Sequence, residues 1–300
     1  MPIAITPEWS CVLDAKANVG EVPIWSARSQ RLYWIDIYAP SLNRTDPLTG
    51  ATQTWRFTSP IGSYALDADE AFALVALQEG YFKLDLRTGA SSMLFAAPYD
   101  VANYRFNDGR CDRQGRFWVG TARLRDSTQP DGGASFYRLD AQGPVRLIEG
   151  VTIANGIAWS PDGRTMYLAD RPNWQMLAFD YDPASGVPSN RRRFAGLNVG
   201  EIPDGAVVDS EGFYWIALMD AGKILRFSPA GELDRILEAP TLQPTMITFG
   251  GHDYRTLFVT TAAHDRGSKE AAAERLAGGI FSLDLDVRGI PEPRVKWLWG

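Results

Sequence analysis

The sequence repeats one pattern of turns and short strands six times, and this repetition restricts the possible fold more than any other feature. Each repeat has a turn, a short apolar strand, a second turn and an aromatic-rich strand such as RFWVG (Arg116–Gly120). Successive repeats start 40, 45, 47, 49 and 41 residues apart, measured between the markers Pro23, Ser63, Asp108, Asn155, Asp204 and Thr245. A period of about 40–50 residues with about four β-strands per unit is typical of β-propeller blades.

We therefore expect an all-β fold, a six-bladed β-propeller with about four antiparallel strands per blade. The strand segments alternate and are rich in Ile, Val, Phe, Tyr and Trp, the residues that pack best on a pleated sheet. A chain of 300 residues is long for one domain, but propellers of this length can be single domains. No break in composition divides the chain, so residues 1–300 are expected to form a single domain.

Composition excludes several classes of protein. The net charge is −6 and no Lys/Arg stripe is present, so a nucleic-acid-binding protein is not expected. No apolar run approaches the length of about 18 residues that a transmembrane helix needs, and MPIAITPEWS at the start lacks the features of a signal peptide. The chain has two cysteines, Cys11 and Cys111, which suits reduced thiols. We expect a cytoplasmic protein without membrane contact, and nothing indicates an obligate protein partner.

The turns before the first strands carry polar side chains at matching places. In a propeller the first strand of each blade lines the central channel, and the residue before it lies at the channel mouth. Glu21, Asp108, Asn155 and Asp204 are expected there in repeats one, three, four and five. Carboxylates and amides without thiols or imidazoles favour a hard divalent cation. Asn-Gly and Asp-Gly are also common turn dipeptides, so spacing alone leaves both interpretations open.

Seven segments, in order along the chain, resemble the regucalcin/gluconolactonase family, which also includes the luciferin-regenerating enzymes. They are GEVPIW (Gly20–Trp25), RFNDGRCDRQGRFWVGT (Arg105–Thr121), NGIAWSPDGRTMYLAD (Asn155–Asp170), FDYDPASGVPSNRR (Phe179–Arg192), PDGAVVDSEGFYWIAL (Pro203–Leu218), FGGHDYRTLFVTTA (Phe249–Ala262) and GGIFSLDLDVRGIPEP (Gly278–Pro293). The resemblance covers most of the chain. It implies a six-bladed propeller and a metal-dependent lactonase that hydrolyses a sugar-acid lactone to the free aldonic acid in sugar catabolism.

The resemblance also implies roles for individual residues. Glu21, Asn155 and Asp204 would hold one divalent metal ion, with calcium expected first and zinc, manganese, iron or magnesium as alternatives. Asp204 would in addition take the proton from the attacking water, as the catalytic base. Arg105 and Asn107 match positions that bind substrate near the metal.

One segment departs from the family pattern. Regucalcin-like members carry a Glu-rich stretch after the Gly-Thr of the third repeat, whereas this chain has ARLRDSTQPDGG, with Arg123 and Arg125. Arg123 is therefore a candidate contact to the substrate. We expect the long loops Ala122–Ala134 and Ala263–Ala277 to select the lactone, because loops on a rigid scaffold commonly carry specificity. Gluconate, xylonate, arabinonate, galactonate and rhamnonate lactones all remain compatible with the sequence.

Two other classes of function remain open. A propeller hydrolase of phosphotriesters or other esters would use a similar channel cation, so the metal does not distinguish it from a lactonase. A non-catalytic propeller that serves as an interaction platform would bind no metal. A serine hydrolase is disfavoured because no G-x-S-x-G motif is present.

Overall fold

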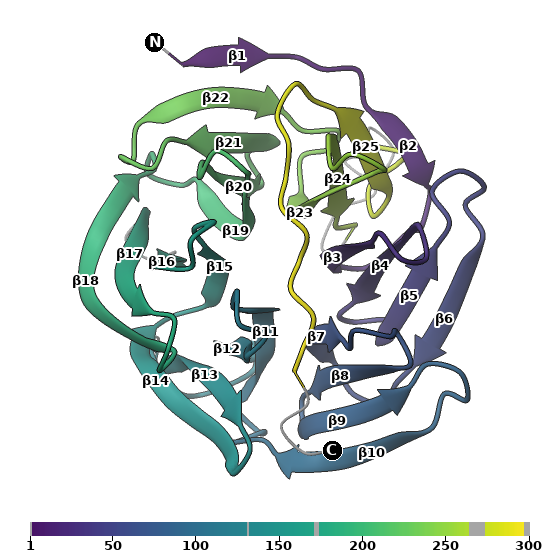
Figure 1. Ribbon diagram of the computed structural model, residues 1–300, viewed down its shortest axis with the longest axis vertical. Coiled ribbons are helices and arrows are strands. Elements are labelled where there is room, and N and C mark those ends of the chain that lie inside the picture. The colour runs from purple at the N-terminus through teal and green to yellow at the C-terminus, as the bar shows by residue number, and fades with distance from the viewer. Residues whose placement is uncertain (1, 131, 171–173, 264–273, 297–300) are drawn as a thin grey trace.

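The protein is a six-bladed β-propeller, as predicted (Figure 1). The computed structural model describes residues 2–130, 132–170, 174–263 and 274–296. These residues form six sheets around a central axis, with the first strand of each blade innermost. Over the same residues the secondary structure consists of strands and turns without a helix, and none of it forms an apolar helix long enough to cross a bilayer.

Four blades consist of consecutive antiparallel strands. Blade one contains β3 (Gly20–Ser26), β4 (Arg31–Asp36), β5 (Ser41–Thr45) and β6 (Thr52–Arg56), and blade two contains β7 (Ile61–Leu66), β8 (Phe72–Leu77), β9 (Gly80–Asp85) and β10 (Ser91–Ala96). Blade three contains β11 (Tyr104–Cys111), β12 (Phe117–Arg123), β13 (Ala134–Asp140) and β14 (Gly143–Val151), and blade four contains β15 (Ala154–Trp159), β16 (Thr165–Asp170), β17 (Gln175–Asp182) and β18 (Val187–Gly196).

The two remaining blades include strands from the start of the chain. Blade six contains β23 (Pro244–Gly250), β24 (Thr256–Thr261), β25 (Ile280–Asp284) and, as its outer strand, β2 (Ser10–Leu13). Blade five contains β19 (Ile202–Val208), β20 (Tyr214–Met219), β21 (Lys223–Phe227) and β22 (Leu233–Glu238), and β1 (Ile3–Ile5) adds a fifth, parallel strand. The antiparallel pairing of β2 with β25 joins the two ends of the chain and closes the ring.

Carboxylates stabilise the hairpins between the first two strands of several blades. Asp67 Oδ1 accepts the Phe72 N–H at 2.9 Å, and Asp112 Oδ1 accepts the N–H groups of Gln114 and Arg116, both at 2.9 Å. Asp209 plays the same part in blade five. These Asp residues explain the second turn of the repeat, because an Asp side chain that accepts nearby backbone N–H groups favours a tight turn.

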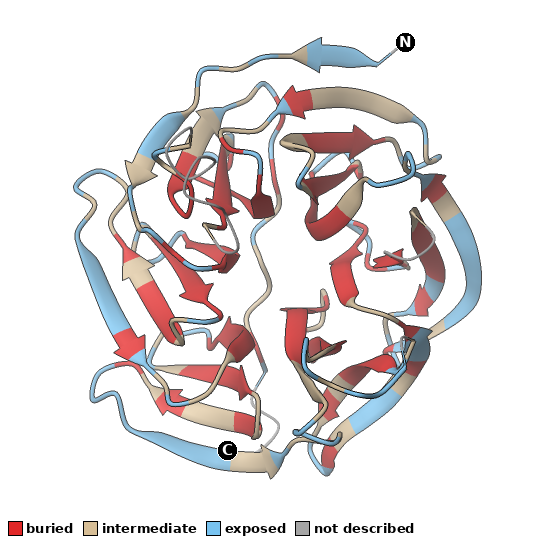
Figure 2. Ribbon diagram, turned by 180° about the vertical axis from the view of Figure 1, so that it is seen from behind, coloured by how far each residue is buried: buried red, intermediate tan, exposed pale blue. Residues whose placement is uncertain are grey.

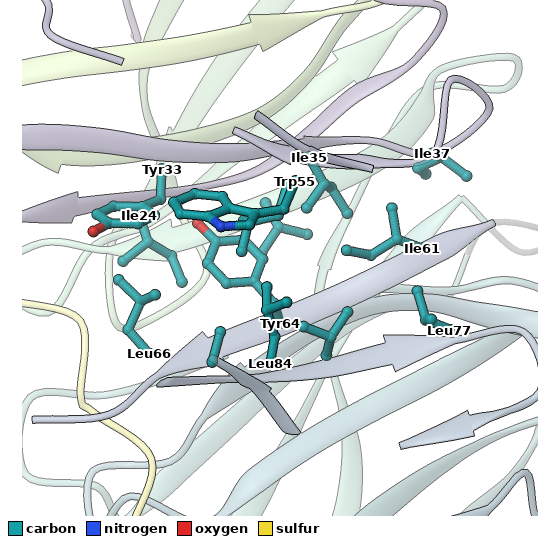
Figure 3. Packing of buried hydrophobic residues seen from close by; sticks show 14 of the residues in the cluster. Ile24, Tyr33, Ile35, Ile37, Trp55, Ile61, Tyr64, Leu66, Leu77 and Leu84 are labelled. Atoms are coloured by element: carbon teal, nitrogen blue, oxygen red, sulfur yellow. The ribbon is translucent and has the colours of Figure 1, made fainter. Parts of the chain in front are cut away.

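The core lies between neighbouring blades. Figure 2 shows buried inner strands and largely exposed outer strands such as β6 and β18. Between blades one and two, Tyr33 and Ile35 pack against Tyr64 and Leu66, with Trp55 closing the outer side (Figure 3). Each such side chain contributes about 1.5–3 kcal/mol on full burial. The six blades are therefore held together mainly by apolar contacts between their faces.

The C-terminal tail, residues 285–296, crosses the axis and covers one end of the channel (Figure 1). Its backbone hydrogen-bonds to residues in or next to the first hairpins of four blades: Tyr254, Ser210, Leu66 and Gly115. These hairpins follow the inner strands, so the tail closes the end opposite the mouth. Glu292 of the tail forms an ion pair with Arg110 of β11, and both side chains are at least nine-tenths buried.

We predict that Glu292→Gln lowers the free energy of unfolding by about 3 kcal/mol, because it leaves the Arg110 guanidinium buried without its counter-charge. Asp69→Asn is the matched control, since Asp69 pairs with Arg28 on the surface and such pairs contribute about 0–1 kcal/mol. Urea denaturation of both variants tests this. Equal losses would show that the buried pair has no special role.

Candidate active site

Each of the six inner strands carries one extra residue opposite the second strand of its blade, which is the mark of a β-bulge. The shifts in register lie between Glu21 and Ile24, Ile61 and Ser63, Phe106 and Gly109, Asn155 and Ala158, Pro203 and Ala206, and Pro244 and Met246. A bulge redirects side chains and is common beside active sites. The Asn-Gly and Asp-Gly pairs of the repeats therefore belong to these bulges and not to isolated turns.

The lining of the cavity identifies which side chains of the bulges are equivalent at the mouth. The pairing alone does not separate Asn107 from Asp108, because Arg110 and Cys111 both pair with an aromatic residue of β12. The bulge residues that line the cavity are Glu21, Asn107, Asn155 and Asp204. We take these four as the equivalent positions.

The prediction that Asp108 belongs to this set was wrong by one residue. Asn107 occupies the equivalent position, while Asp108 does not line the cavity at the mouth. Asp108 Oδ2 instead accepts the backbone N–H of Ile157 at 3.1 Å. Burial raises the pKa of Asp108 to about 6, although the Arg110 guanidinium and backbone N–H groups act in the opposite direction.

In the bulge of β3, the residue next to the predicted metal ligand Glu21 has a strained backbone. Val22 has a φ of 46°, a left-handed conformation that is unusual for a β-branched residue. The equivalent residue in β15 is Gly156, which adopts a φ of 64° without a side chain to clash. The strained Val22 lies directly after Glu21, and Glu21 Oε2 accepts the Val22 N–H at 3.1 Å. Such strain is common at functional sites.

Side-chain amides connect three consecutive blades at the mouth. Asn107 Nδ2 donates to Ala154 O at 3.0 Å and to Asn155 Oδ1 at 2.5 Å. Asn155 Nδ2 in turn donates to Pro203 O at 3.2 Å. These bonds fix both amides, and they orient Asn155 Oδ1 with a second lone pair still able to accept.

Two carboxylates face the same cavity from blades one and five. Glu21 and Asp204 are both buried. Burial raises the pKa of Glu21 well above its usual range, and the charges of Asp204 and Asp108 raise it further. Buried like charges disfavour ionisation of one another, and a bound cation would remove this repulsion.

Arg105 is held in place beside these groups. Its Nη1 donates to Phe106 O and to Asn107 Oδ1, both at 2.8 Å. Its guanidinium carbon lies 5.4 Å from the centre of the Tyr38 ring, a cation–π arrangement. A guanidinium has five N–H donors, so the fixed Arg105 can still donate to a ligand in the cavity.

All six predicted site residues line one cavity of about 340 Å³, a size common for small-molecule sites. They are Glu21, Arg105, Asn107, Arg123, Asn155 and Asp204. The sequence did not point to the aromatic and apolar part of the lining, which includes Tyr38, Ile37, Ile153, Ile202 and Met219. These residues carry no motif, and only closure of the ring brings them together.

The two predicted specificity loops differ in how far the structure describes them. In the first, Ala122 and Arg123 belong to β12, and the connection to β13 begins at Leu124. Ala122, Arg123, Leu124 and Arg125 all line the cavity. In the second, residues 264–273 lie outside the described part of the chain.

The residues present fit a divalent cation. Glu21, Asp204 and Asn155 offer two anionic oxygens and one amide oxygen to one cavity, the donor types that hard cations prefer. Over the described residues no three His, Cys, Asp or Glu side chains gather into a metal-binding group. A cation here would thus rely on the amide oxygen of Asn155 as well as the two carboxylates.

The chain belongs to the SMP-30/gluconolactonase/LRE-like family, whose sequence model matches residues 19–263. It is 38% identical over 288 residues to a 6-deoxy-6-sulfogluconolactonase of Pseudomonas putida, covering 94% of this chain and 97% of that protein. It is 33% identical over 289 residues to regucalcin of Oryctolagus cuniculus, covering 94% and 96%. The resemblance inferred from the sequence is thus confirmed.

Solved structures agree with this assignment. A regucalcin of Agrobacterium tumefaciens, described as a calcium-binding protein, matches with a TM-score of 0.93 and 25% identity, covering 99% of this chain and 100% of that one. A luciferin-regenerating enzyme matches with a TM-score of 0.87 and 25% identity, covering 97% and 100%.

We predict that Glu21→Gln raises the unfolding temperature of the chelator-treated protein by about 2 °C, the order of shift that ~1 kcal/mol produces in a large domain. Glutamine resembles protonated glutamate, keeps an acceptor for the Val22 N–H, and removes the repulsion from Asp204. Differential scanning calorimetry measures the shift. Glu232→Gln, at an exposed position, should leave the temperature unchanged. A lower unfolding temperature for Glu21→Gln would contradict the repulsion.

Proposed function

We propose that this cavity hydrolyses the ring ester of a sugar-acid lactone, with one divalent cation held by Glu21, Asn155 and Asp204. The observation that carries the proposal is the convergence of two buried carboxylates, a fixed amide and a fixed guanidinium on one cavity. Membership of the SMP-30/gluconolactonase/LRE-like family supports a lactonase, and relatives named for lactone hydrolysis support this substrate class.

The residues of the chain supply the steps around the reacting ester. A cation held by Glu21, Asn155 and Asp204 would polarise the lactone carbonyl and favour ionisation of water near neutral pH. Asp204 takes the proton from the attacking water as general base. Water adds to the carbonyl carbon, the bond to the ring oxygen breaks, and that oxygen takes up a proton as the new hydroxyl. The product is the open-chain aldonic acid.

Arg105 and Asn107 position the substrate. Arg105 is fixed by Asn107 Oδ1 and by the Tyr38 ring, so its remaining N–H donors have a defined direction. Such donors bind ring hydroxyls, or stabilise the negative charge that develops on the carbonyl oxygen. Arg123 lines the rim of the same cavity, where it would contact the far part of the substrate.

Calcium is the cation we favour. The ligand set consists of oxygens alone, which suits hard cations, and one structural relative is described as a calcium-binding protein. We place the reaction in the breakdown of sugar acids in the cytoplasm, which the free thiols of Cys11 and Cys111 suit.

Asp204→Asn tests the catalytic base. Asn has nearly the same size and forms turns as well as Asp, but it carries no charge and cannot accept the proton. We expect a folded variant whose lactone turnover falls by about 10²-fold or more. A pH-drop assay on a panel of lactones, with circular dichroism on the same preparation, measures both quantities.

Asp162→Asn is the matched control for Asp204→Asn. Asp162 also stands in a Pro-Asp-Gly sequence, but it lies in the β15–β16 hairpin at the far end of blade four, where it bonds Ser160 and Arg164. Its variant should keep normal turnover. Near wild-type turnover in a folded Asp204→Asn protein would refute the proposed base.

Removal of the metal tests the cation. Protein stripped with a chelator should lose lactone hydrolysis, and calcium should restore it. Glu21→Gln should weaken calcium binding about tenfold or more in calorimetric titrations, because one of two anionic ligands is lost. Full turnover by the stripped protein would refute the role of the cation in catalysis. If the protein hydrolysed aryl esters or phosphotriesters in preference to lactones, the proposed substrate class would be wrong.

A further inference from the structure

The ionisable residues that line the cavity carry an excess of positive charge. Among the described lining residues, three are arginines and two are acids: Arg105, Arg123, Arg125, Glu21 and Asp204. The proposed divalent cation increases the excess to three positive charges. The chain as a whole has a net charge of −6, so this cavity differs in sign from the rest of the protein. A positively charged cavity attracts an anionic ligand and disfavours a cationic one.

The charges are separated along the cavity. Glu21 and Asp204 come from the inner strands β3 and β19, where they would hold the cation. Arg123 ends β12, and Arg125 follows in the connection to β13, on the mouth side of blade three. Arg125 is exposed and Arg123 is partly buried. A substrate with its ester at the proposed cation would therefore extend toward two guanidinium groups at the rim.

The segment that carries these arginines is held by a hydrogen-bonded support. Arg123 Nη1 donates to Ser127 O at 2.8 Å. Ser127 Oγ donates to Asn103 Oδ1 at 2.7 Å, and the Leu124 N–H donates to Asn103 O at 2.8 Å. These bonds fix the turn between Leu124 and Ser127 against the segment that enters β11. A fixed segment loses little conformational entropy when a ligand binds.

We propose that the substrate is a sugar-acid lactone with an oxyanion group on the carbon farthest from the ring ester, bound by Arg123 and Arg125. This inference rests on the proposed lactonase function and adds the class of substrate. Guanidinium groups bind sulfonate, phosphate and carboxylate oxygens through paired, charge-assisted hydrogen bonds. The relative with 38% identity is named for a 6-deoxy-6-sulfogluconolactone, a molecule of this class.

Binding of the open-chain products tests the inference without turnover. Calorimetry on the calcium-loaded full-length protein compares gluconate with 6-deoxy-6-sulfogluconate, 6-phosphogluconate and glucarate. We expect at least one of the last three to bind about tenfold or more tightly than gluconate, a difference of about 1.4 kcal/mol. The ligand that binds most tightly shows which group the site prefers: sulfonate, phosphate or carboxylate. Equal affinity for all four would overturn the inference.

Arg125→Gln tests the assigned contact. Because Arg125 is exposed, the variant should fold, and its preference for the tightest oxyanion ligand over gluconate should fall about tenfold. Arg28→Gln is the control, since Arg28 is an exposed arginine of the β3–β4 hairpin, at the opposite end of blade one from the mouth. It should keep the wild-type preference. An unchanged preference in Arg125→Gln would overturn the role of Arg125.

Lactone hydrolysis separates this inference from the proposed function. The pH-drop assay compares glucono-1,5-lactone with the 6-phospho and 6-sulfo lactones. Equal kcat/KM for neutral and anionic lactones would overturn the inference while the lactonase stands. Tight oxyanion binding without hydrolysis of any lactone would overturn the lactonase while oxyanion recognition stands.

Discussion

The antiparallel pairing of β2 with β25 is the constraint on which the site depends. The candidate ligands come from blades one, four and five, and the substrate-contact residues from blade three. They lie far apart in the chain and share one cavity because the blades form a closed ring. Glu21 follows β2 by a few residues, so the pairing that closes blade six also sets the position of blade one. Apolar contacts between blade faces then keep this geometry rigid.

The bulges convert that ring into a site. A regular inner strand would alternate its side chains between two faces of the blade, whereas an extra residue turns the bulged side chains toward the axis. The arrangement has an energetic cost, since it buries Glu21 and Asp204 together and leaves Val22 in a strained conformation. The cost is tolerated because the large core offsets it. A binding site that is destabilised on its own is common in enzymes.

Much of this could be predicted from the sequence. The period of the repeats predicted six blades, and the six candidate residues do line one cavity. The error at Asp108 arose because Asn107 and Asp108 are neighbours in the same bulge, and only the lining of the cavity shows which of them faces the mouth. The closing strand β2 and the parallel strand β1 were not predicted, because three or four residues carry too weak a pattern. Tyr38 was also missed, because its role depends on Arg105, which packs beside its ring only in the folded chain.

The C-terminal tail has a consequence for how the protein is made. Chains emerge from the ribosome N-terminus first, and early blades can pair their own strands as soon as they appear. Blade six cannot be completed until β25 is synthesised, and the tail residues that bond four hairpins follow later still. Until β25 has been synthesised, β2 therefore has no strand to pair with. The ring is still open at that stage, so the carboxylates of Glu21 and Asp204 are not yet held together. The proposed cation site is therefore completed only after the last blade has been made.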